Sequence, residues 1–292
     1  MSTSSEPRSA PDQWLDSAAT LATIDAKSHT ENFPVALAVL PRQYRRDLRA
    51  IYGFARLVDD VGDEAPGDRL ALLDAIDDDI DRLVGTSVPR LEVLRSLVPT
   101  VRTRRLPIDP LHRLVEANRR DQTVHRYATF DDLIDYCTLS ANPVGHLVLG
   151  VFGLAGPERT ALSDLVCTAL QIVEHCQDVA EDAAADRIYL PQQDLARFGV
   201  TPADLTGEKT VQPLRQLLAF EVARAQTLLT RGRPLLGLLH GPARLAVGGF
   251  VGGGQAALDS LAAAGFDVVP APPPVGKWRT ARTCLAALAA TR

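Results

Sequence analysis

The chain contains few aromatic residues, few cysteines and no long apolar run. Aromatic residues make up 5% of its 292 residues, and only four cysteines occur, none in a CxxC pair. Neither a disulfide framework nor a thiolate metal site is supported, so we expect reduced thiols buried in the core. No stretch of 18 uncharged apolar residues occurs, and residues 1–11 lack an apolar signal segment. These two absences favour a cytoplasmic protein.

The chain also lacks an excess of positive charge. Its 31 Lys and Arg residues are outnumbered by 36 Asp and Glu residues, which gives a formal net charge of −5. A strongly basic field, the usual footprint of nucleic-acid binding, is therefore absent, and we expect no nucleic-acid partner. Apolar residues make up 46% of the sequence and recur at intervals of three and four. This period predicts an all-α fold.

Composition divides the chain into four parts. We expect a disordered leader at residues 1–12, a helical domain at 13–267, a Pro-rich linker at 268–276 and a C-terminal helix at 277–292. Pro and Gly predict helix breaks within the domain near residues 41, 65–67, 107–110, 153–157, 191, 199–202, 213, 232–234 and 241–242.

Two glycine-rich or amphipathic segments near the C-terminus allow more than one interpretation. Residues 248–254 (GGFVGGG) follow no predicted strand and lack the P-loop lysine, so close helix packing is favoured over a nucleotide loop. Residues 277–282 place Lys277, Trp278, Arg279 and Arg282 before an apolar stretch. Such a segment suits peripheral contact with the inner face of a membrane, but an ordinary docking helix fits equally well.

The first acidic segment, residues 52–63 (YGFARLVDDVGD), is the strongest functional signal in the N-terminal half. Helical spacing puts Tyr52, Arg56, Asp59 and Asp63 on one stripe, which we expect to face a pocket. The helix should end just after these acids, where negative charge costs roughly 0.3–1 kcal/mol. The acidic run at residues 77–81 has no such stripe, and we interpret it as a solvated face.

The second acidic segment lies about 120 residues further on. Gln171, Glu174, Asp178 and Asp182 follow one another at intervals of three and four and form a column of oxygen donors on one helix. Hard cations such as Mg²⁺ prefer these donors. His175 lies beside the column without a second His or Cys at ligand spacing, so a hydrogen-bonding role is favoured over zinc.

Residues 186–191 (DRIYLP) come directly after this segment and contain a guanidinium and a phenol, Arg187 and Tyr189. Arginine binds phosphate oxygens with two parallel hydrogen bonds, so Arg187 is a candidate diphosphate ligand. Two carboxylate segments and phosphate-binding cations together indicate a metal-assisted diphosphate site.

These two motifs, in this order, resemble those of the head-to-head trans-isoprenyl diphosphate synthases, the family of squalene and phytoene synthases. The resemblance covers about residues 28–265 and implies a single-domain isoprenoid synthase (class I terpenoid synthase) fold, an all-α bundle with a central cavity. It implies a Mg²⁺ cofactor and catalytic roles for Tyr52 and Tyr136. The implied metal ligands are Asp59, Asp63, Glu174, Asp178 and Asp182. The implied substrate-binding residues are Phe33, Arg56, Gln171, Arg187, Tyr189, Ser140 and Asn142.

Three segments resemble the bacterial hydroxysqualene synthase branch of hopanoid biosynthesis: residues 31–35 (ENFPV), 136–145 (YCTLSANPVG) and 188–191 (IYLP). Glu174 departs from the family pattern, because many members have a metal-binding asparagine there. The resemblance implies presqualene diphosphate as substrate, and other hopanoid-pathway enzymes as partners.

Residues 140–143 (SANP) carry a separate hypothesis. Pro143 removes a backbone donor, and Ser140, Asn142 and the carbonyl of Leu139 could then hold one water in a terpenoid pocket. This water would capture the final carbocation. A helix kink that only shapes the cavity is the competing interpretation.

The predicted function is ionisation and rearrangement of presqualene diphosphate with water capture, which yields hydroxysqualene and pyrophosphate. A prenyltransferase that joins two prenyl diphosphates into presqualene diphosphate, squalene or phytoene is the alternative on the same scaffold. A noncatalytic binding or assembly protein is the alternative of another class, although such proteins should lose the metal carboxylates.

Overall fold

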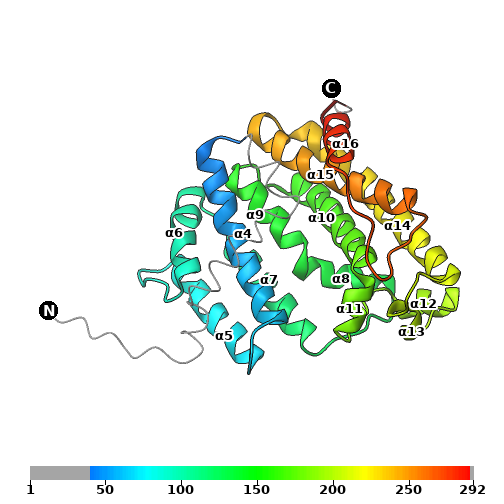
Figure 1. The fold of residues 1–292 in the computed structure, drawn as a ribbon. Coiled ribbons are helices and arrows are strands. Elements are labelled where there is room, and N and C mark those ends of the chain that lie inside the picture. Colours follow the sequence, from blue (N-terminus) through cyan, green and yellow to red (C-terminus); the bar gives the residue numbers. More distant parts are fainter. Residues whose placement is uncertain (1–39, 290–292) are drawn as a thin grey trace.

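The computed structural model describes residues 40–289, which form helices packed around one another (Figure 1). The first helices are α4 (Arg42–Asp63), α5 (Arg69–Ile80), η1 (Asp81–Leu83), α6 (Glu92–Arg104), α7 (Asp109–Asp121), α8 (Phe130–Ser140) and α9 (Asn142–Val151). They are followed by α10 (Pro157–Gln177), α11 (Val179–Ala184), α12 (Gln192–Phe198), α13 (Pro202–Leu205), α14 (Gln212–Gly232), η2 (Arg233–Leu238), α15 (Gly241–Ala263) and α16 (Lys277–Ala289). Within residues 40–289 the one β-type pairing is a bridge between Arg126 and Ile188, and the all-α prediction is confirmed.

The predicted breaks coincide with observed helix ends. Pro41 precedes α4, and the turn at residues 65–67 separates α4 from α5. Pro157, Pro202 and Pro213 stand in the first turn of α10, α13 and α14, where the missing N–H of proline costs nothing. Local backbone geometry therefore decides where these helices begin and end.

The core is built from the apolar faces of these helices. On α4, Phe54, Leu57 and Val58 are fully buried, on the side away from the acidic stripe. Burial of one such side chain contributes about 1.5–3 kcal/mol. Helix α10 contacts α8, α9, α14 and α15, so it runs through the middle of the bundle. A functional residue on α10 is thus held by packing on several sides.

The glycine-rich segment belongs to α15, and the packing interpretation is confirmed. A Cβ atom at Gly252 would lie 2.4 Å from Cα of Cys284 on α16. One at Gly254 would lie 2.2 Å from Cδ2 of Leu170 on α10. Glycine is required at position 252, because the facing atoms belong to the backbone of α16, whereas the atom facing Gly254 is the end of a leucine side chain.

The acidic run at residues 77–81 differs from its interpretation as a solvated face. Asp79 is 2% exposed and accepts hydrogen bonds from the backbone N–H groups of Arg90 and Leu91, both at 2.8 Å. Asp77 pairs with Arg119 at 2.9 Å. The interpretation is wrong for these two acids, which tie α5 to its neighbours, whereas Asp78 is exposed.

Several predictions fall at the chain ends. The predicted leader at residues 1–12 lies outside the described residues, and so does Phe33. Helix α16 follows a non-helical stretch after α15, but the proposed division into domains stays a prediction. Of the four cysteines, Cys137 and Cys176 are buried and the other two are half-buried. Among the described helices, none combines the length and apolar content required to cross a membrane.

Candidate active site

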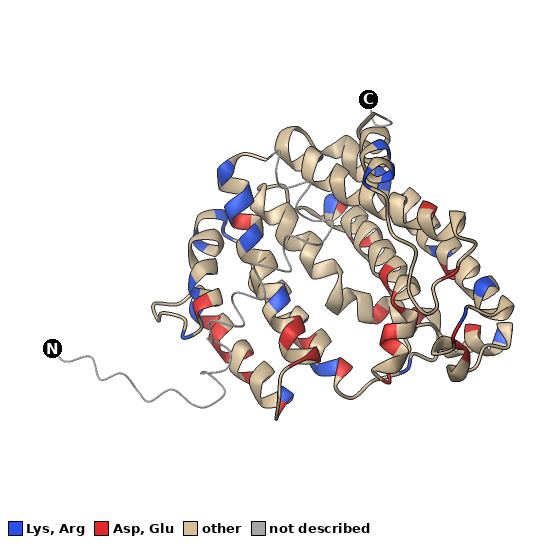
Figure 2. Ribbon diagram, viewed as in Figure 1, with Lys and Arg blue, Asp and Glu red and all other residues tan. Residues whose placement is uncertain are grey.

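The C-terminal end of α4 and the junction of α10 with α11 lie on two sides of one pocket. Figure 2 shows acidic segments at both places. The pocket contains about 840 Å³ of space between the side chains, and this figure includes space open to solvent. Its lining residues come from α4, α7, α8, α10, α11 and the loop after α11: Arg56, Asp59, Asp63, Leu114, Ala117, Asn118, Asp121, Tyr136, Ser140, Gln171, Glu174, His175, Asp178, Asp182, Arg187 and Tyr189.

Most of the residues predicted from the sequence meet in this pocket. Eleven of them line it: Arg56, Asp59, Asp63, Tyr136, Ser140, Gln171, Glu174, Asp178, Asp182, Arg187 and Tyr189. Tyr52 is half-buried on α4 and is not among the lining residues. Asn142 is also not among them: it is 6% exposed, and its Oδ1 accepts a hydrogen bond from Thr168 Oγ1 at 3.0 Å. Asn142 therefore joins α9 to α10 instead of facing the pocket.

The end of α4 is held against α7 by a close contact. A Cβ atom at Gly62 would lie 2.0 Å from Oδ1 of Asn118, so glycine lets the two helices approach. Asn118 Nδ2 then donates to Asp59 Oδ1 at 3.2 Å. Asp60 is 4% exposed and pairs with Arg56 at 2.8 Å. Asp59 and Asp63, in contrast, line the pocket.

The second acidic segment is not one unbroken helix. Helix α10 ends at Gln177 and α11 begins at Val179, with Asp178 at the junction in a non-helical conformation (φ −95°, ψ 14°). The N–H of Asp182 donates to the carbonyl of Asp178 at 2.8 Å, which keeps the chain turning in the same direction. The predicted column is thus interrupted at Asp178, but its four members still line the pocket.

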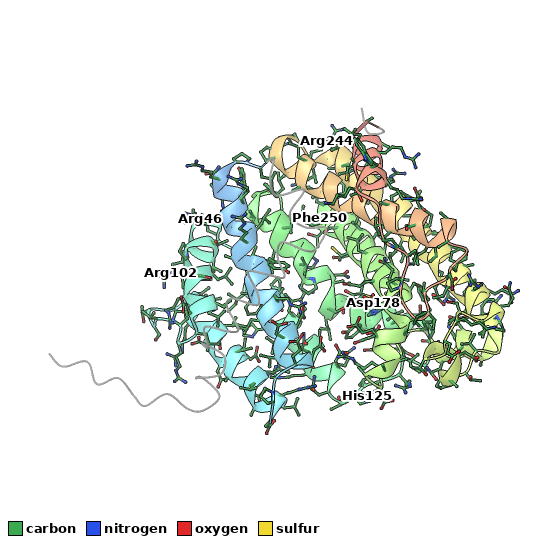
Figure 3. The ribbon with its side chains drawn as sticks, viewed as in Figure 1. Arg46, Arg102, His125, Asp178, Arg244 and Phe250 are labelled. Atoms are coloured by element: carbon green, nitrogen blue, oxygen red, sulfur yellow. The ribbon has the colours of Figure 1, made fainter. Side chains whose placement is uncertain are left out.

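Arg187 connects the two acidic segments directly. Its Nη1 lies 2.6 Å from Asp63 Oδ1, although the two residues are 124 positions apart. The residues on either side of Arg187 are held in place. Arg126 Nη2 lies 2.7 Å from Asp186 Oδ1, and the N–H of Ile188 donates to the carbonyl of His125 at 3.0 Å. Figure 3 shows His125 and Asp178 on this side of the fold.

An aromatic cluster forms one wall of the pocket. The rings of His175 and Tyr189 stack with their centroids 3.9 Å apart, and Tyr136 lies 5.5 Å from Tyr189. The Nε2 atoms of Gln171 and His175 are 3.4 Å apart, and His175 Nδ1 is 3.8 Å from Asp182 Oδ2. His175 therefore acts as a hydrogen-bonding and stacking residue, as the sequence favoured.

Sequence reasoning missed the two polar pocket residues on α7, Asn118 and Asp121. Tyr136 OH donates to Asp121 Oδ2 at 2.5 Å, and Asp121 Oδ1 has no hydrogen-bond partner within the described part of the chain. The only local signal is their spacing of three within residues 118–122 (NRRDQ). The arginines between them make this segment look like an ordinary exposed helix face.

Negative charge dominates the pocket, since six carboxylates and two guanidinium groups line it. Burial raises the pKa of Asp121 to about 6. Burial, followed by the nearby Asp182 and Glu181, raises the pKa of Asp178 to about 6. Desolvation also raises the pKa of Asp59 to about 6, although this side chain is open to solvent, which screens part of the effect. The raised pKa values show that nearby positive charge does not offset the effect of burial on these three carboxylates.

Asp121 should make the stability of the metal-free protein depend on pH. Its pKa is about 6 in the folded state against an ordinary 3.8, so the folded state binds this proton more tightly than the unfolded state. The resulting stabilisation is complete below about pH 4 and is lost as the pH rises through about 6. We expect Asp121→Asn to remove up to about 3 kcal/mol of this decline.

Chemical denaturation of both proteins at a series of pH values tests this prediction. The amide oxygen of Asn can still accept the Tyr136 hydroxyl, so the fold should be retained. Equal declines of the free energy of unfolding in the two proteins would contradict it.

The acidic residues do not form a complete metal centre by themselves. Among residues 40–289, no three His, Cys, Asp or Glu side chains are arranged so that they could hold an ion alone. The donors are nevertheless all oxygen atoms on carboxylates with excess negative charge, which suits a hard divalent cation. Mg²⁺ is commonly held by one or two carboxylates together with substrate phosphates and water.

Comparison with known proteins agrees with this arrangement. The family model for squalene/phytoene synthase matches residues 26–279. A hydroxysqualene synthase from Zymomonas mobilis is 37% identical over 228 residues, covering 75% of this chain and 74% of the relative. A phytoene synthase from Mycobacterium tuberculosis is 33% identical over 215 residues, covering 72% of this chain and 70% of the relative.

Solved structures show the same architecture. The crystal structure of squalene synthase HpnC from Alicyclobacillus acidocaldarius is 41% identical, with a TM-score of 0.76, and the match covers 85% of this chain and 95% of that one. A dehydrosqualene synthase solved with a ligand is 21% identical with a TM-score of 0.83, covers 96% of this chain and 98% of that one, and supports the fold alone. With its two acidic segments joined across one pocket, this chain belongs to the squalene/phytoene synthase family of isoprenoid synthases.

Proposed function

We propose that this protein is a Mg²⁺-dependent hydroxysqualene synthase. It ionises presqualene diphosphate, rearranges the cyclopropylcarbinyl cation and adds water to give hydroxysqualene and pyrophosphate. The observation that carries the proposal is the meeting of both acidic segments in one pocket with Arg56 and Arg187. The similarity to proteins named hydroxysqualene synthase supports the choice of substrate and product.

The carboxylates of both segments are the proposed metal ligands: Asp59, Asp63, Glu174, Asp178 and Asp182. When bound, Mg²⁺ supplies positive charge that stabilises the departing diphosphate. The raised pKa values of Asp59 and Asp178 support this role, because a nearby cation would favour their charged forms. Glu174 contributes a further negative charge to this ligand set.

Arg187 is proposed to bind the leaving diphosphate. Its Nη1 already contacts Asp63, whereas its Nε is buried with no hydrogen-bond partner in the described structure. A phosphate oxygen would satisfy that donor. The contact with Asp63 at the same time orients the guanidinium plane, so little reorganisation is required as negative charge develops on the leaving group.

Ser140 is proposed to bind the reacting water, and Asp121 is proposed to accept its proton. Ser140 Oγ is buried in the pocket lining and has no hydrogen-bond partner among residues 40–289, so an ordered water would satisfy it. As the water oxygen bonds to the carbocation, one O–H bond breaks. Asp121 Oδ1, a second buried oxygen of a pocket residue without a hydrogen-bond partner among residues 40–289, accepts that proton. Asn142 takes no part, because Thr168 occupies its side chain.

Ser140→Ala should change the products more than the rate. Without the hydroxyl that orients the water, we expect the ratio of alcohol to hydrocarbon elimination products to fall about tenfold, as for the loss of one hydrogen bond to a reacting group. Gas chromatography of the products measures the ratio. Asn142→Ala is the matched control, since this residue lies outside the pocket; an unchanged ratio in Ser140→Ala contradicts the role of Ser140.

Product analysis decides the function itself. The purified protein is incubated with Mg²⁺ and either presqualene diphosphate or farnesyl diphosphate alone. Hydroxysqualene formed from presqualene diphosphate supports the proposal. Presqualene diphosphate, squalene or phytoene formed from simple prenyl diphosphates would establish the second candidate, a prenyltransferase, which the similarity to phytoene synthases favours. If no substrate releases pyrophosphate, the result would support the noncatalytic binding or assembly role.

A further inference from the structure

Helix α16 has two faces with different surroundings. Thr283 and Ala287 are buried against α15, and Thr283 Oγ1 donates to the carbonyl of Gly252 at 2.7 Å. On the outer side, Trp278 is 91% exposed and Leu285 is 70% exposed. The inner face therefore explains why α16 docks on the bundle. It does not explain the outward-facing indole and leucine, which an isolated soluble protein gains nothing by exposing.

The same helix is positively charged within an acidic protein. It carries Lys277, Arg279 and Arg282 and no acidic residue, whereas the whole chain has a formal net charge of −5. Arg279 reaches inward to the carbonyl of Asp259 at 2.9 Å. Lys277 and Arg282 are exposed, and within the described part of the chain no ion pair involves them. Cations thus flank the exposed apolar residues.

The position of α16 in the fold is also informative. Figure 1 shows α16 at the end of the molecule opposite α11, and Figure 3 places Arg244, next to α16, far from Asp178. Arg244 Nη2 donates to the carbonyl of Leu288 at 2.7 Å, which anchors the end of α16 to the start of α15. The outer face of α16 can therefore contact a surface without covering the acidic pocket.

We propose that the outer face of α16 binds the surface of an anionic lipid bilayer. The helix lies in the plane of the interface, with Trp278 and Leu285 among the lipid headgroups and chains and with Lys277 and Arg282 against lipid phosphates. A tryptophan that is almost fully exposed suits this boundary, because its ring is apolar and its N–H is polar. The proposal concerns a surface away from the pocket and does not depend on which reaction the pocket catalyses.

A membrane fits this face better than a second protein. A helix of 13 residues is about 20 Å long, and one exposed stripe of it covers a few hundred Å² at most. A stable protein interface buries about 800 Å² on each partner. A bilayer needs no such area, because a few apolar side chains and the attraction of cations to anionic headgroups add up to reversible binding.

Vesicle sedimentation with the full-length protein tests the proposal. Vesicles of phosphatidylcholine alone are compared with vesicles that contain one-third phosphatidylglycerol. We expect binding to the anionic vesicles that weakens with added salt, and weak binding to phosphatidylcholine. Trp278→Ala should lower the partition coefficient about tenfold, and Arg282→Gln about fivefold with a smaller salt dependence.

Two matched controls separate the face of α16 from general surface effects. Leu70→Ala removes another exposed leucine, on α5, and Arg231→Gln removes an exposed arginine on α14. Neither control should change vesicle binding. The proposal is overturned if the anionic vesicles do not bind the protein, or if the controls weaken binding as much as the α16 variants. It is also overturned if Trp278→Ala dissociates an oligomer in sedimentation velocity while vesicle binding is unchanged.

Discussion

Replacing Asp178 with Asn is expected to lower pyrophosphate release by about 10²–10³-fold, the loss that follows removal of one preorganised charged group at a reacting centre. Asp178 lies at the junction of α10 and α11, in the pocket that also holds Asp59 and Asp63. The amide keeps the size of the side chain but removes its charge. The rate of pyrophosphate release from the substrate that the wild-type protein turns over, at saturating Mg²⁺, measures the effect.

Stability separates this catalytic loss from unfolding. The pKa of Asp178 is raised to about 6, so its charge at neutral pH destabilises the metal-free folded state. Asp178→Asn should therefore unfold at the same temperature as the wild-type protein or at a higher one. Asp78→Asn, at an exposed position outside the pocket, is the control and should keep full activity. Full activity of the Asp178→Asn variant would contradict the proposed role of the second acidic segment in the site.

Gly252→Ala is expected to destabilise the protein by about 2–3 kcal/mol, the upper part of the range for overpacking. The added methyl group would lie 2.4 Å from Cα and 2.6 Å from the backbone nitrogen of Cys284. Backbone atoms cannot turn aside as a side chain can, so α16 has to move away from α15. This cost exceeds the gain of about 1 kcal/mol that Ala brings over Gly within a helix.

Gly253→Ala provides the matched control for this experiment, because its added methyl group has no atom within 4 Å apart from its chain neighbours and the backbone of its own helix. The control should be slightly more stable than the wild-type protein, by up to about 1 kcal/mol. Chemical denaturation compares the three proteins, and limited proteolysis shows whether α16 is released first. Equal stability of the two variants would mean that α15 and α16 are not closely packed at Gly252.

The acidic stripes could be predicted because helical periodicity is a local property. Spacings of three and four place Asp59 with Asp63 and Gln171 with Glu174 on single faces, wherever the helices lie in the fold. Pro and Gly predicted the helix ends for the same reason, since they act on their own φ and on the adjacent hydrogen bonds. The interruption at Asp178 has no such residue beside it and was not predicted.

The environment of individual polar residues could not be predicted in this way. Asp79 belongs to an acidic run whose pattern predicts a solvated face, yet it is buried and accepts hydrogen bonds from two backbone N–H groups. The sequence does not reveal the partners of Asn142 and Asp121 either. One of them binds Thr168 on another helix, and the other joins Tyr136 at the pocket wall. Each role depends on a partner distant in the chain.

The sequence by itself determined the all-α fold class, most helix ends and the two sets of carboxylates, because periodicity and backbone restrictions act over a few neighbouring residues. Only the tertiary structure decided that Arg187 contacts Asp63 and that α16 exposes Trp278. It also decided that Asp121 lines the pocket and that Asn142 does not. These outcomes depend on how helices far apart in the sequence pack. Close packing sets which side chains meet, and no local pattern contains that information.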